Sequence, residues 1–449
     1  MDRNPSPPPD REDERGGDGD AIGETAYSKH WLFSTLTRLI QMVTDQDSEQ
    51  GEGLTELSDE LEEELCKVWD MAMDKDVAGF LQEFKAPDIL LGVIAKSHNP
   101  RLTEICVGIL GNMACFPSTC EFISQNDGLG AVLLLLLGDS DPPTLLETCR
   151  LLLTCVSQPD VSPLWLQRIQ QQTDTRNNLC FIMRSSTNVD LLIKVGELID
   201  KLFDEDEELM KSWMSGATSQ SDQDTQQDVA SALLEAAVQL RRESPKALEA
   251  YLHALQLLTT VDEGLQNLVS NEGCGVSLWM MVCEMVCEDL CQPDDPPLIL
   301  QEQKALLAPA LAILSALYAN LQTNISSELV ASLFRILYFD NENQQRLHQE
   351  SGQDAVRDVQ IQVLAEIAVE LLSTLLTQLP TDVVSELLKL DYLTETIWVS
   401  AMKSVLPQHS TSVVCLVSTL TEMEPKLAAV IKKECSIPSE TKEPTSETT

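Results

Sequence analysis

The sequence predicts an all-α chain organised as helical repeats, on the strength of three observations. Apolar residues make up 43% of the 449 residues and aromatic residues only 4%, a composition that favours helices over a β-sandwich. Apolar positions recur at spacings of three and four along most of the chain, and the alternation typical of strands is almost absent. Helical segments also share residues at offsets of 43 and 46, which is the period of armadillo- and HEAT-like solenoids.

Three consecutive helices carry this repeat. They are expected at residues 102–115, 144–156 and 191–202, and an Asn or Asp suited to capping precedes each of them. Glu104 in the first helix recurs as Glu147 in the second, and the second matches the third at an offset of 46. Because a single repeat cannot bury its own apolar face, we expect neighbouring repeats to stack and complete the core.

The chain is expected to divide into five segments. A Pro- and acid-rich stretch at the start and a Ser/Gln/Asp-rich stretch near the middle lack the apolar residues that a core requires. Ser6, which precedes a proline, is a candidate phosphorylation site. The expected segments are a disordered arm at 1–21, armadillo-like helical repeats at 22–214, a disordered linker at 215–228, further helical repeats at 229–435 and a disordered tail at 436–449.

The charge of the chain restricts its partners. With 30 basic and 72 acidic residues, the formal net charge is −42. This excludes direct binding to nucleic acid, which needs clustered Lys and Arg, and binding to an anionic membrane surface. The longest apolar run, residues 131–137, is too short to span a bilayer. Thirteen cysteines without a signal segment indicate an intracellular protein with reduced thiols, rather than a secreted one.

No motif in the sequence indicates catalysis. The five histidines share no motif, and neither a nucleophile elbow nor a phosphate-binding glycine loop is present. Cys283, Cys287 and Cys291 share one face of a helix, a spacing close to that of metal ligands. No His lies near them, however, and the interleaved Val282 and Val286 favour a buried apolar stripe. We therefore expect a non-enzyme without a cofactor, metal or small-molecule substrate.

The octet at residues 107–114, VGILGNMA, resembles the signature helix of armadillo proteins. In those proteins this helix lines the concave groove, its Asn binds the backbone of an extended peptide, and its Trp packs against basic side chains. Asn112 matches that Asn, but Gly108 stands where the Trp would be, so the ladder used to bind nuclear-localisation signals is not expected. The candidate residues of a partner-binding groove are Arg101, Glu104, Gly108, Asn112, Glu147, Arg150 and Lys194.

Longer stretches of sequence carry a family resemblance. They include YSKHWLF at 27–33, ICVGILGNMACF at 105–116 and DSDPPTLLE at 139–147. These stretches closely resemble the serum amyloid A-like family, most densely over about residues 1–320. The resemblance implies an armadillo-type helical protein of the nucleus that promotes cell proliferation and has no catalytic activity. It leaves the cytoplasm open as a further location.

Two functions remain open at this point. The first is a scaffold or adaptor that binds other proteins on the concave surface of stacked repeats. The second is an acidic carrier or chaperone for basic client proteins, which works through charge. Salt discriminates between them, because attraction between exposed charges is screened beyond about 8 Å at physiological salt. A third hypothesis is an enzyme with a cryptic site. Metal bound to the purified protein would support it, whereas the sequence does not.

Overall fold

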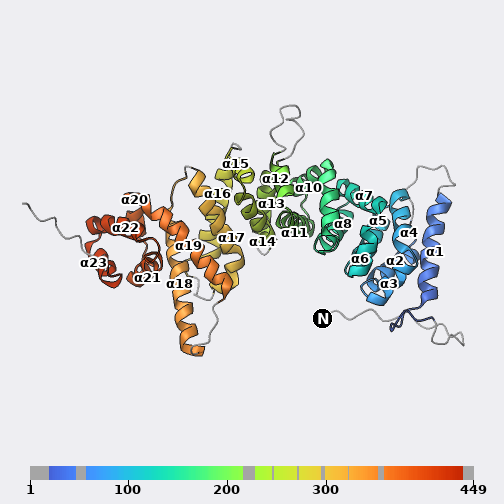
Figure 1. Ribbon diagram of the computed structural model, residues 1–449, viewed down its shortest axis with the longest axis horizontal. Helices are drawn as coiled ribbons and strands as arrows, with labels where there is room; N and C mark the ends of the chain where they lie inside the picture. Colours follow the sequence, from blue (N-terminus) through green and yellow to red (C-terminus); the bar gives the residue numbers. More distant parts are fainter. Residues whose placement is uncertain are drawn as a thin grey trace, which may run out of the picture. The chain divides into compact units, whose positions relative to one another are not determined.

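The computed structural model describes residues 20–46, 57–215, 228–244, 247–270, 273–294, 299–321, 323–351 and 358–437 (Figure 1). Within these ranges all the regular secondary structure is helical, apart from one isolated β-bridge between Ala21 and Ser28. The predicted all-α helical-repeat architecture is confirmed. Ser6 and nearly all of the predicted arm, linker and tail lie outside the described residues.

The chain forms two compact units, and it passes from the first to the second between Ala254 and Leu255. The linker expected at 215–228 therefore does not separate the units. The reason is that α13 (Val229–Glu243) packs on α10 (Thr173–Ser185) of the first unit. One helix, α14 (Leu248–Thr259), crosses the boundary between the units.

The first unit is built from repeats of three helices. Each repeat ends in a long helix, and these long helices pack side by side in the order α2, α5, α8 and α11. The second helices of the repeats, α4 and α7, form a neighbouring row that begins with α1. The helices not yet given are α1 (Lys29–Gln46), α2 (Asp59–Met71), α3 (Lys75–Glu83), α4 (Ala86–Lys96), α5 (Pro100–Met113), α6 (Pro117–Ser124), α7 (Asp127–Leu135), η1 (Leu136–Gly138), α8 (Pro142–Val156), α9 (Ser162–Gln171), α11 (Val189–Glu205) and α12 (Glu207–Ser215).

The predicted capping residues begin the long helices. The side chains of Asn99, Asp141 and Asn188 accept hydrogen bonds from backbone N–H groups in the first turns of α5, α8 and α11, respectively. Each cap satisfies a donor that has no partner within its own helix. Near the start of the unit, α2 ends at Met71 and the side chain of Asp74 caps a separate helix, α3, by accepting from the N–H groups of Asp76 and Val77.

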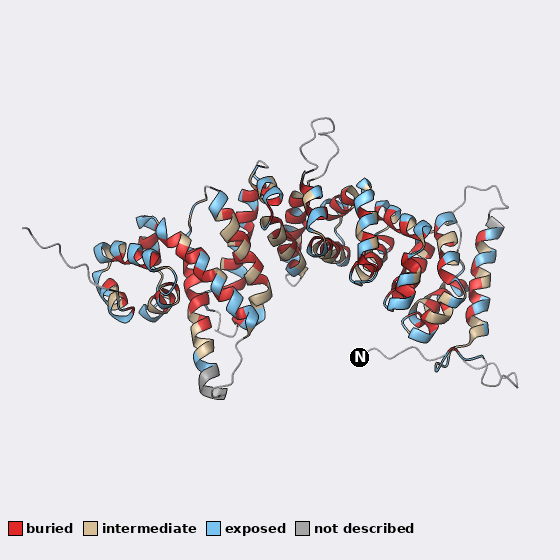
Figure 2. Ribbon diagram, in the orientation of Figure 1, coloured by how far each residue is buried: buried red, intermediate tan, exposed pale blue. Residues whose placement is uncertain are grey.

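The buried faces of the first unit point toward neighbouring helices (Figure 2). Leu102, Ile105 and Ile109 of α5 are fully buried, as the three-and-four spacing predicts. The largest buried side chain, Trp165 of α9, donates from its ring nitrogen to the hydroxyl of Ser124 on α6 at 2.8 Å. That bond joins two consecutive repeats and satisfies the polar atom of the indole.

The second unit is also made of paired rows. One row consists of α17, α19 and α22, and the other runs from α16 through α18 to α21. A π-helix continues α16 directly. The elements are α15 (Asp262–Ser270), α16 (Cys274–Glu284), the π-helix η4 (Met285–Leu290), α17 (Ile299–Asn320), α18 (Ser327–Ser351), α19 (Val359–Thr377), α20 (Thr381–Leu387), α21 (Glu395–Val405), α22 (Ser410–Met423) and α23 (Pro425–Glu434).

Among the described residues, α19 is long and apolar enough to cross a membrane, and a bent pair of helices, 117–124 with 127–138, passes the same test. Packing accounts for the apolarity of α19, because 56% of its most apolar window is buried between neighbours such as α17 and α22. The core helix of a solenoid has the same composition as a membrane span.

Candidate functional site

The residues predicted for a partner-binding groove lie on the row of long helices in the first unit. Four of them lie on α5, Glu147 and Arg150 lie on α8, and Lys194 lies on α11. We call α2, α5, α8 and α11 the ladder helices. The structure brings the predicted residues of α5 and α8 into direct contact, whereas Lys194 pairs within its own helix with Glu197.

Asn112 connects three of the ladder helices. Its side-chain amide donates to the backbone carbonyl of Trp69 on α2 at 2.8 Å, and its oxygen accepts from Arg150 on α8 at 3.0 Å. The side chain is only 6% exposed. In this chain, therefore, Asn112 holds neighbouring repeats together through both ends of its amide.

Arg150 extends the same network. Its guanidinium donates to the carbonyl of Gly108 at 3.1 Å and pairs with Glu147 at 2.6 Å. It also covers Gly111, where an added Cβ would lie 2.8 Å from the guanidinium nitrogen. One side chain thus binds the backbone, an amide and a carboxylate across two repeats.

Gly108 has a packing role that the sequence did not reveal. The indole of Trp69, from the preceding ladder helix, lies directly over it, and an added Cβ would be 2.1 Å from the ring. The Trp that the armadillo signature lacks on α5 is therefore replaced in space by a ring from α2. Gly196 on α11 similarly lies beneath Tyr251, whose hydroxyl donates to the carbonyl of Leu192 at 2.6 Å.

The charges along the ladder helices are paired with one another. Arg101 donates to Glu62 and to Glu104, each at 2.7 Å, and these bonds, with Glu104 contributing most, raise the pKa of Arg101. Further along the unit, His253 pairs with Asp200 at 2.6 Å, which raises the pKa of the imidazole. Arg101 is therefore paired on both sides, although the ladder helices together carry 13 acidic and only 5 basic residues and are acidic like the chain as a whole.

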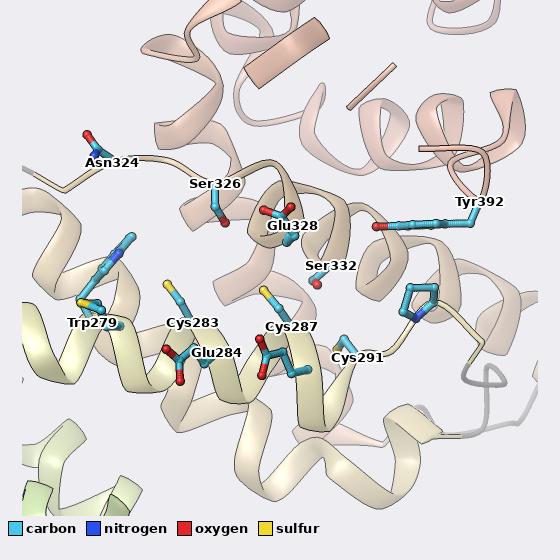
Figure 3. A pocket seen from close by; sticks show the side chains of 13 residues that line it. Trp279, Cys283, Glu284, Cys287, Cys291, Asn324, Ser326, Glu328, Ser332 and Tyr392 are labelled. Atoms are coloured by element: carbon cyan, nitrogen blue, oxygen red, sulfur yellow. The ribbon is translucent and has the colours of Figure 1, made fainter. Parts of the chain in front are cut away.

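A cavity of about 460 Å³ lies in the second unit between the α16–η4 segment and α18 (Figure 3). We call it the thiol cavity, because Cys283, Cys287 and Cys291 line it together with Trp279, Glu328 and Tyr392. The thiols of Cys283 and Cys287 point toward Glu328 on the opposite wall. The sequence singles out the three cysteines, but favours a buried apolar stripe over a metal site and does not predict a cavity wall.

That earlier interpretation is correct for the valines and wrong for two of the cysteines. Val282 and Val286 are buried, whereas Cys283 and Cys287 are only partly buried and border the cavity. Burial raises the pKa of Cys283 to about 12 and that of Cys287 to about 11, so both thiols are protonated at neutral pH. In the part of the chain that the structure describes, no group of three or more His, Cys, Asp or Glu side chains is arranged to hold a metal ion.

The rim of the thiol cavity is acidic. Glu284, Glu288 and Glu328 line it and are exposed, while none of its lining residues is Lys, Arg or His. Beside them, Met280 exposes 55% of its side chain. Behind this wall, buried Arg335 donates to the carbonyl of Cys291 at 2.7 Å and to that of the next residue.

Comparison with known proteins identifies the family. The family described as the SAAL1 C-terminal domain matches residues 175–413. Protein saal1 of Danio rerio is 65% identical and covers 98% of this chain and 95% of its own length. Protein SAAL1 of Homo sapiens is 46% identical over 96% of this chain and 98% of its own length. The chain belongs to the SAAL1 family.

This finding corrects the earlier assignment to a serum amyloid A-like family. The relatives are named for SAAL1, serum amyloid A-like 1, which is a family separate from serum amyloid A. Solved structures give fainter likenesses. A designed armadillo repeat protein is 15% identical with a TM-score of 0.41, over 63% of this chain and 99% of its own. An engineered protein is 14% identical with a TM-score of 0.44, over 64% of this chain and 97% of its own.

The region that matches the SAAL1 family model contains one of the two candidate surfaces and almost none of the other. Residues 175–413 include the whole thiol cavity, but they begin after α2, α5 and α8 and so include only Lys194 of the predicted groove residues. The named domain of the SAAL1 family and the ladder network of the first unit are therefore largely different parts of the chain.

Proposed function

We propose that this SAAL1-family chain is a non-catalytic scaffold that binds other proteins on the exposed face of its ladder helices. We call this surface the ladder face; it comprises the exposed and half-exposed side chains of Cys66, Trp69, Met73, Arg101 and Cys115. The proposal extends the armadillo-like fold, in which stacked repeats offer one long continuous surface. No substrate, metal or nucleic acid enters it.

The observation that carries the proposal is the bonding of Asn112 across three helices. It donates to Trp69 on one side and accepts from Arg150 on the other. Side chains fixed in this way present a preformed surface, so a partner loses less conformational freedom on binding. The charge pairs of Arg101 and Arg150 further favour a partner that is held by shape and apolar contact more than by net charge.

The test uses the full chain with an exposed apolar residue of the ladder face exchanged for a charge. Met73, 58% exposed in the turn after α2, is the probe, and Phe181, 60% exposed on α10 outside the ladder, is the matched control. We expect partners captured from nuclear extract in high salt to be lost with Met73→Glu and kept with Phe181→Glu. Equal retention by both variants would contradict the ladder face as the binding surface.

The same experiment replaces a less informative one. Asn112→Ala removes bonds that hold α2, α5 and α8 together, so any loss of binding would mix a folding defect with a lost contact. Met73→Glu leaves those bonds in place. The predicted groove residues keep their role in the proposal as the support of the surface, and their direct contact with a partner stays a prediction.

A second candidate is the acidic carrier for basic clients. The net charge of −42 and the base-free rim of the thiol cavity favour it. Under this alternative, captured proteins would be basic, and raising the salt would release them equally from wild type, Met73→Glu and Phe181→Glu, because screening acts on all exposed charges.

Location and physiological role are further parts of the proposal. By resemblance, we propose a nuclear protein that promotes cell proliferation. Imaging the tagged full chain tests the first statement, and counting cells after depletion and rescue tests the second. A tagged chain that stays outside the nucleus would refute the nuclear assignment without affecting the scaffold itself.

A further inference from the structure

We propose that the thiol cavity is a docking site for a basic peptide segment of a protein partner, with an arginine or lysine side chain seated at its Trp279 end. This inference rests on the proposed scaffold function and names the chemistry of one partner. It concerns the second unit only, so the ladder face plays no part in it.

The walls of the cavity suit the stem of such a side chain. Trp279, Met280 and Cys283 follow one another along α16 and supply an indole, a thioether and a thiol. The thiols of Cys283 and Cys287 are protonated at neutral pH, so this wall is uncharged. The methylene chain of Arg or Lys packs well on such surfaces. Trp279 itself is only 6% exposed and lies against Tyr318, so it contributes the edge of this wall.

The rim suits the charged head. Glu284 lies beside Cys283, and Glu328 faces it from α18 (Figure 3). Glu288, on the π-helix that continues α16, adds a third carboxylate about one turn after Glu284. None of the described residues that line the cavity is basic, so a cation that enters at the Trp279 end faces carboxylates, and this charge complementarity selects a basic occupant over an acidic or neutral one.

The opposite end of the cavity explains why the cation is placed near Trp279. The guanidinium of Arg335 lies 5.9 Å from the ring centre of Tyr392. Its positive charge disfavours a second cation at that end. Tyr392 is instead suited to contact an uncharged side chain of the same peptide. The cavity should therefore bind a segment in which a basic residue is followed or preceded by an apolar one.

The π-helix provides the geometry. After α16 ends at Glu284, the chain continues as a π-helix from Met285 to Leu290. Short π segments inside helices are uncommon and often occur at functional sites. Here the segment carries Cys287 and Glu288 on the wall of the cavity, and Arg335 holds its end by donating to the carbonyls of Cys291 and Gln292.

Direct binding to the full chain tests the site. The probe is a fluorescein-labelled, acetylated peptide of Gly and Ser in which arginine and leucine alternate, and its control carries citrulline, the uncharged analogue, at each arginine. The variant is Glu284→Gln/Glu288→Gln/Glu328→Gln. Its matched control neutralises three exposed acids elsewhere in the second unit, Glu263→Gln/Asp382→Asn/Glu422→Gln.

We expect the arginine peptide to bind and the citrulline peptide not to bind. Exposed ion pairs are individually weak, but three together should change the dissociation constant about tenfold, so the cavity variant should bind about tenfold more weakly than the control variant. Equal weakening in both variants, equal binding of both peptides, or failure of the arginine peptide to bind would each overturn the inference. Matching unfolding midpoints show that the variants fold alike.

A second measurement locates the bound peptide. With ¹³C-methyl methionine in the chain, Met280 reports on the cavity and Met73, which is equally exposed, reports on the ladder face of the first unit. We expect the arginine peptide to shift the Met280 signal and leave that of Met73 unchanged. A shift at Met73 alone would overturn the cavity site while supporting the ladder face, so failure of one proposal is distinguishable from failure of the other.

Discussion

Two arginines show how differently the two units use a cation. Arg150 in the first unit is partly exposed and binds an asparagine, a carbonyl and a carboxylate across two stacked helices. Arg335 in the second unit is buried and binds two carbonyls at the end of a π-helix. The bonds of Arg150 join the helices of a packed surface. Arg335 instead supports the wall of an open cavity, and none of the described residues that line this cavity is basic.

This contrast shows that polar residues have different roles in the two units. Along the ladder helices, Arg101 and Arg150 bond to groups of their own and the neighbouring helix and so join the repeats. Around the thiol cavity, the carboxylates of Glu284, Glu288 and Glu328 are exposed and line the opening. Stability and binding should therefore respond to different substitutions in the two units.

The largest effect is expected at Arg335. Its replacement by Ala leaves the carbonyls of Cys291 and Gln292, just after the π-helix, without their charged donor, and each hydrogen bond to a charged group contributes about 1.5–3 kcal/mol. Arg346→Ala, an exposed arginine on the same helix, is the control and should change the free energy of unfolding by less than about 0.5 kcal/mol. Urea unfolding of both variants measures the difference, and equal values would remove the support assigned to Arg335.

A glycine of the ladder should come next. Gly108→Ala forces a methyl group into the indole of Trp69 and should lower the free energy of unfolding by about 1–3 kcal/mol. Gly92, in α4, has no heavy atom within 4 Å of an added Cβ, so Gly92→Ala should instead raise it by about 0.5–1 kcal/mol. Opposite signs at two helical glycines would separate close packing from helix propensity, and the same sign at both would refute the Trp69 contact.

Exchanging polar groups sharpens the comparison between the units. Asn112→Ala removes two hydrogen bonds between repeats and should lower the free energy of unfolding by about 1–2 kcal/mol. The variant Glu284→Gln/Glu288→Gln/Glu328→Gln should change it by less than about 0.5 kcal/mol per site, because substitutions of exposed side chains usually have small effects on stability. If the cavity variant proved the less stable of the two, its carboxylates would be structural.

The smallest effect should be a pH dependence at His253. Asp200 raises the pKa of this imidazole in the folded chain, so the pair stabilises the fold in full below the unfolded value of about 6.5. The contribution is lost as the pH rises through the folded pKa. The difference in unfolding midpoint between wild type and His253→Gln should therefore be larger at about pH 5.5 than at about pH 8.5. A difference independent of pH would exclude a charged pair.

Much of the first unit could be predicted from the sequence. Asn99, Asp141 and Asn188 were placed correctly as caps, because capping depends on residues a few positions apart. The pairing of Trp69 with Gly108 could not be predicted in the same way. It depends on how two repeats stack, and only the missing Trp of the octet and the small residue in its place pointed toward it.

The second unit was harder to predict for a physical reason. Its contacts between helices share no single sequence separation: Ser327 bonds to Glu386 across 59 residues and Lys304 to Asp358 across 54, whereas Arg335 bonds to Cys291 across 44. A repeat search tuned to periods in the forties therefore finds only part of this unit. The cysteine spacing was visible, but the wall opposite it comes from α18 and could not be placed.

The π-helix has a consequence for the evolution of this chain. Each residue of an α-helix turns about 100°, so adding or removing one residue between Cys274 and Met285 would rotate everything after it by about that angle. Cys287 and Glu288 would then leave the wall of the cavity, although the composition of the segment would hardly change. Chain length at this point, and not only residue identity, sets which side chains the cavity displays, and a single-codon deletion could close it.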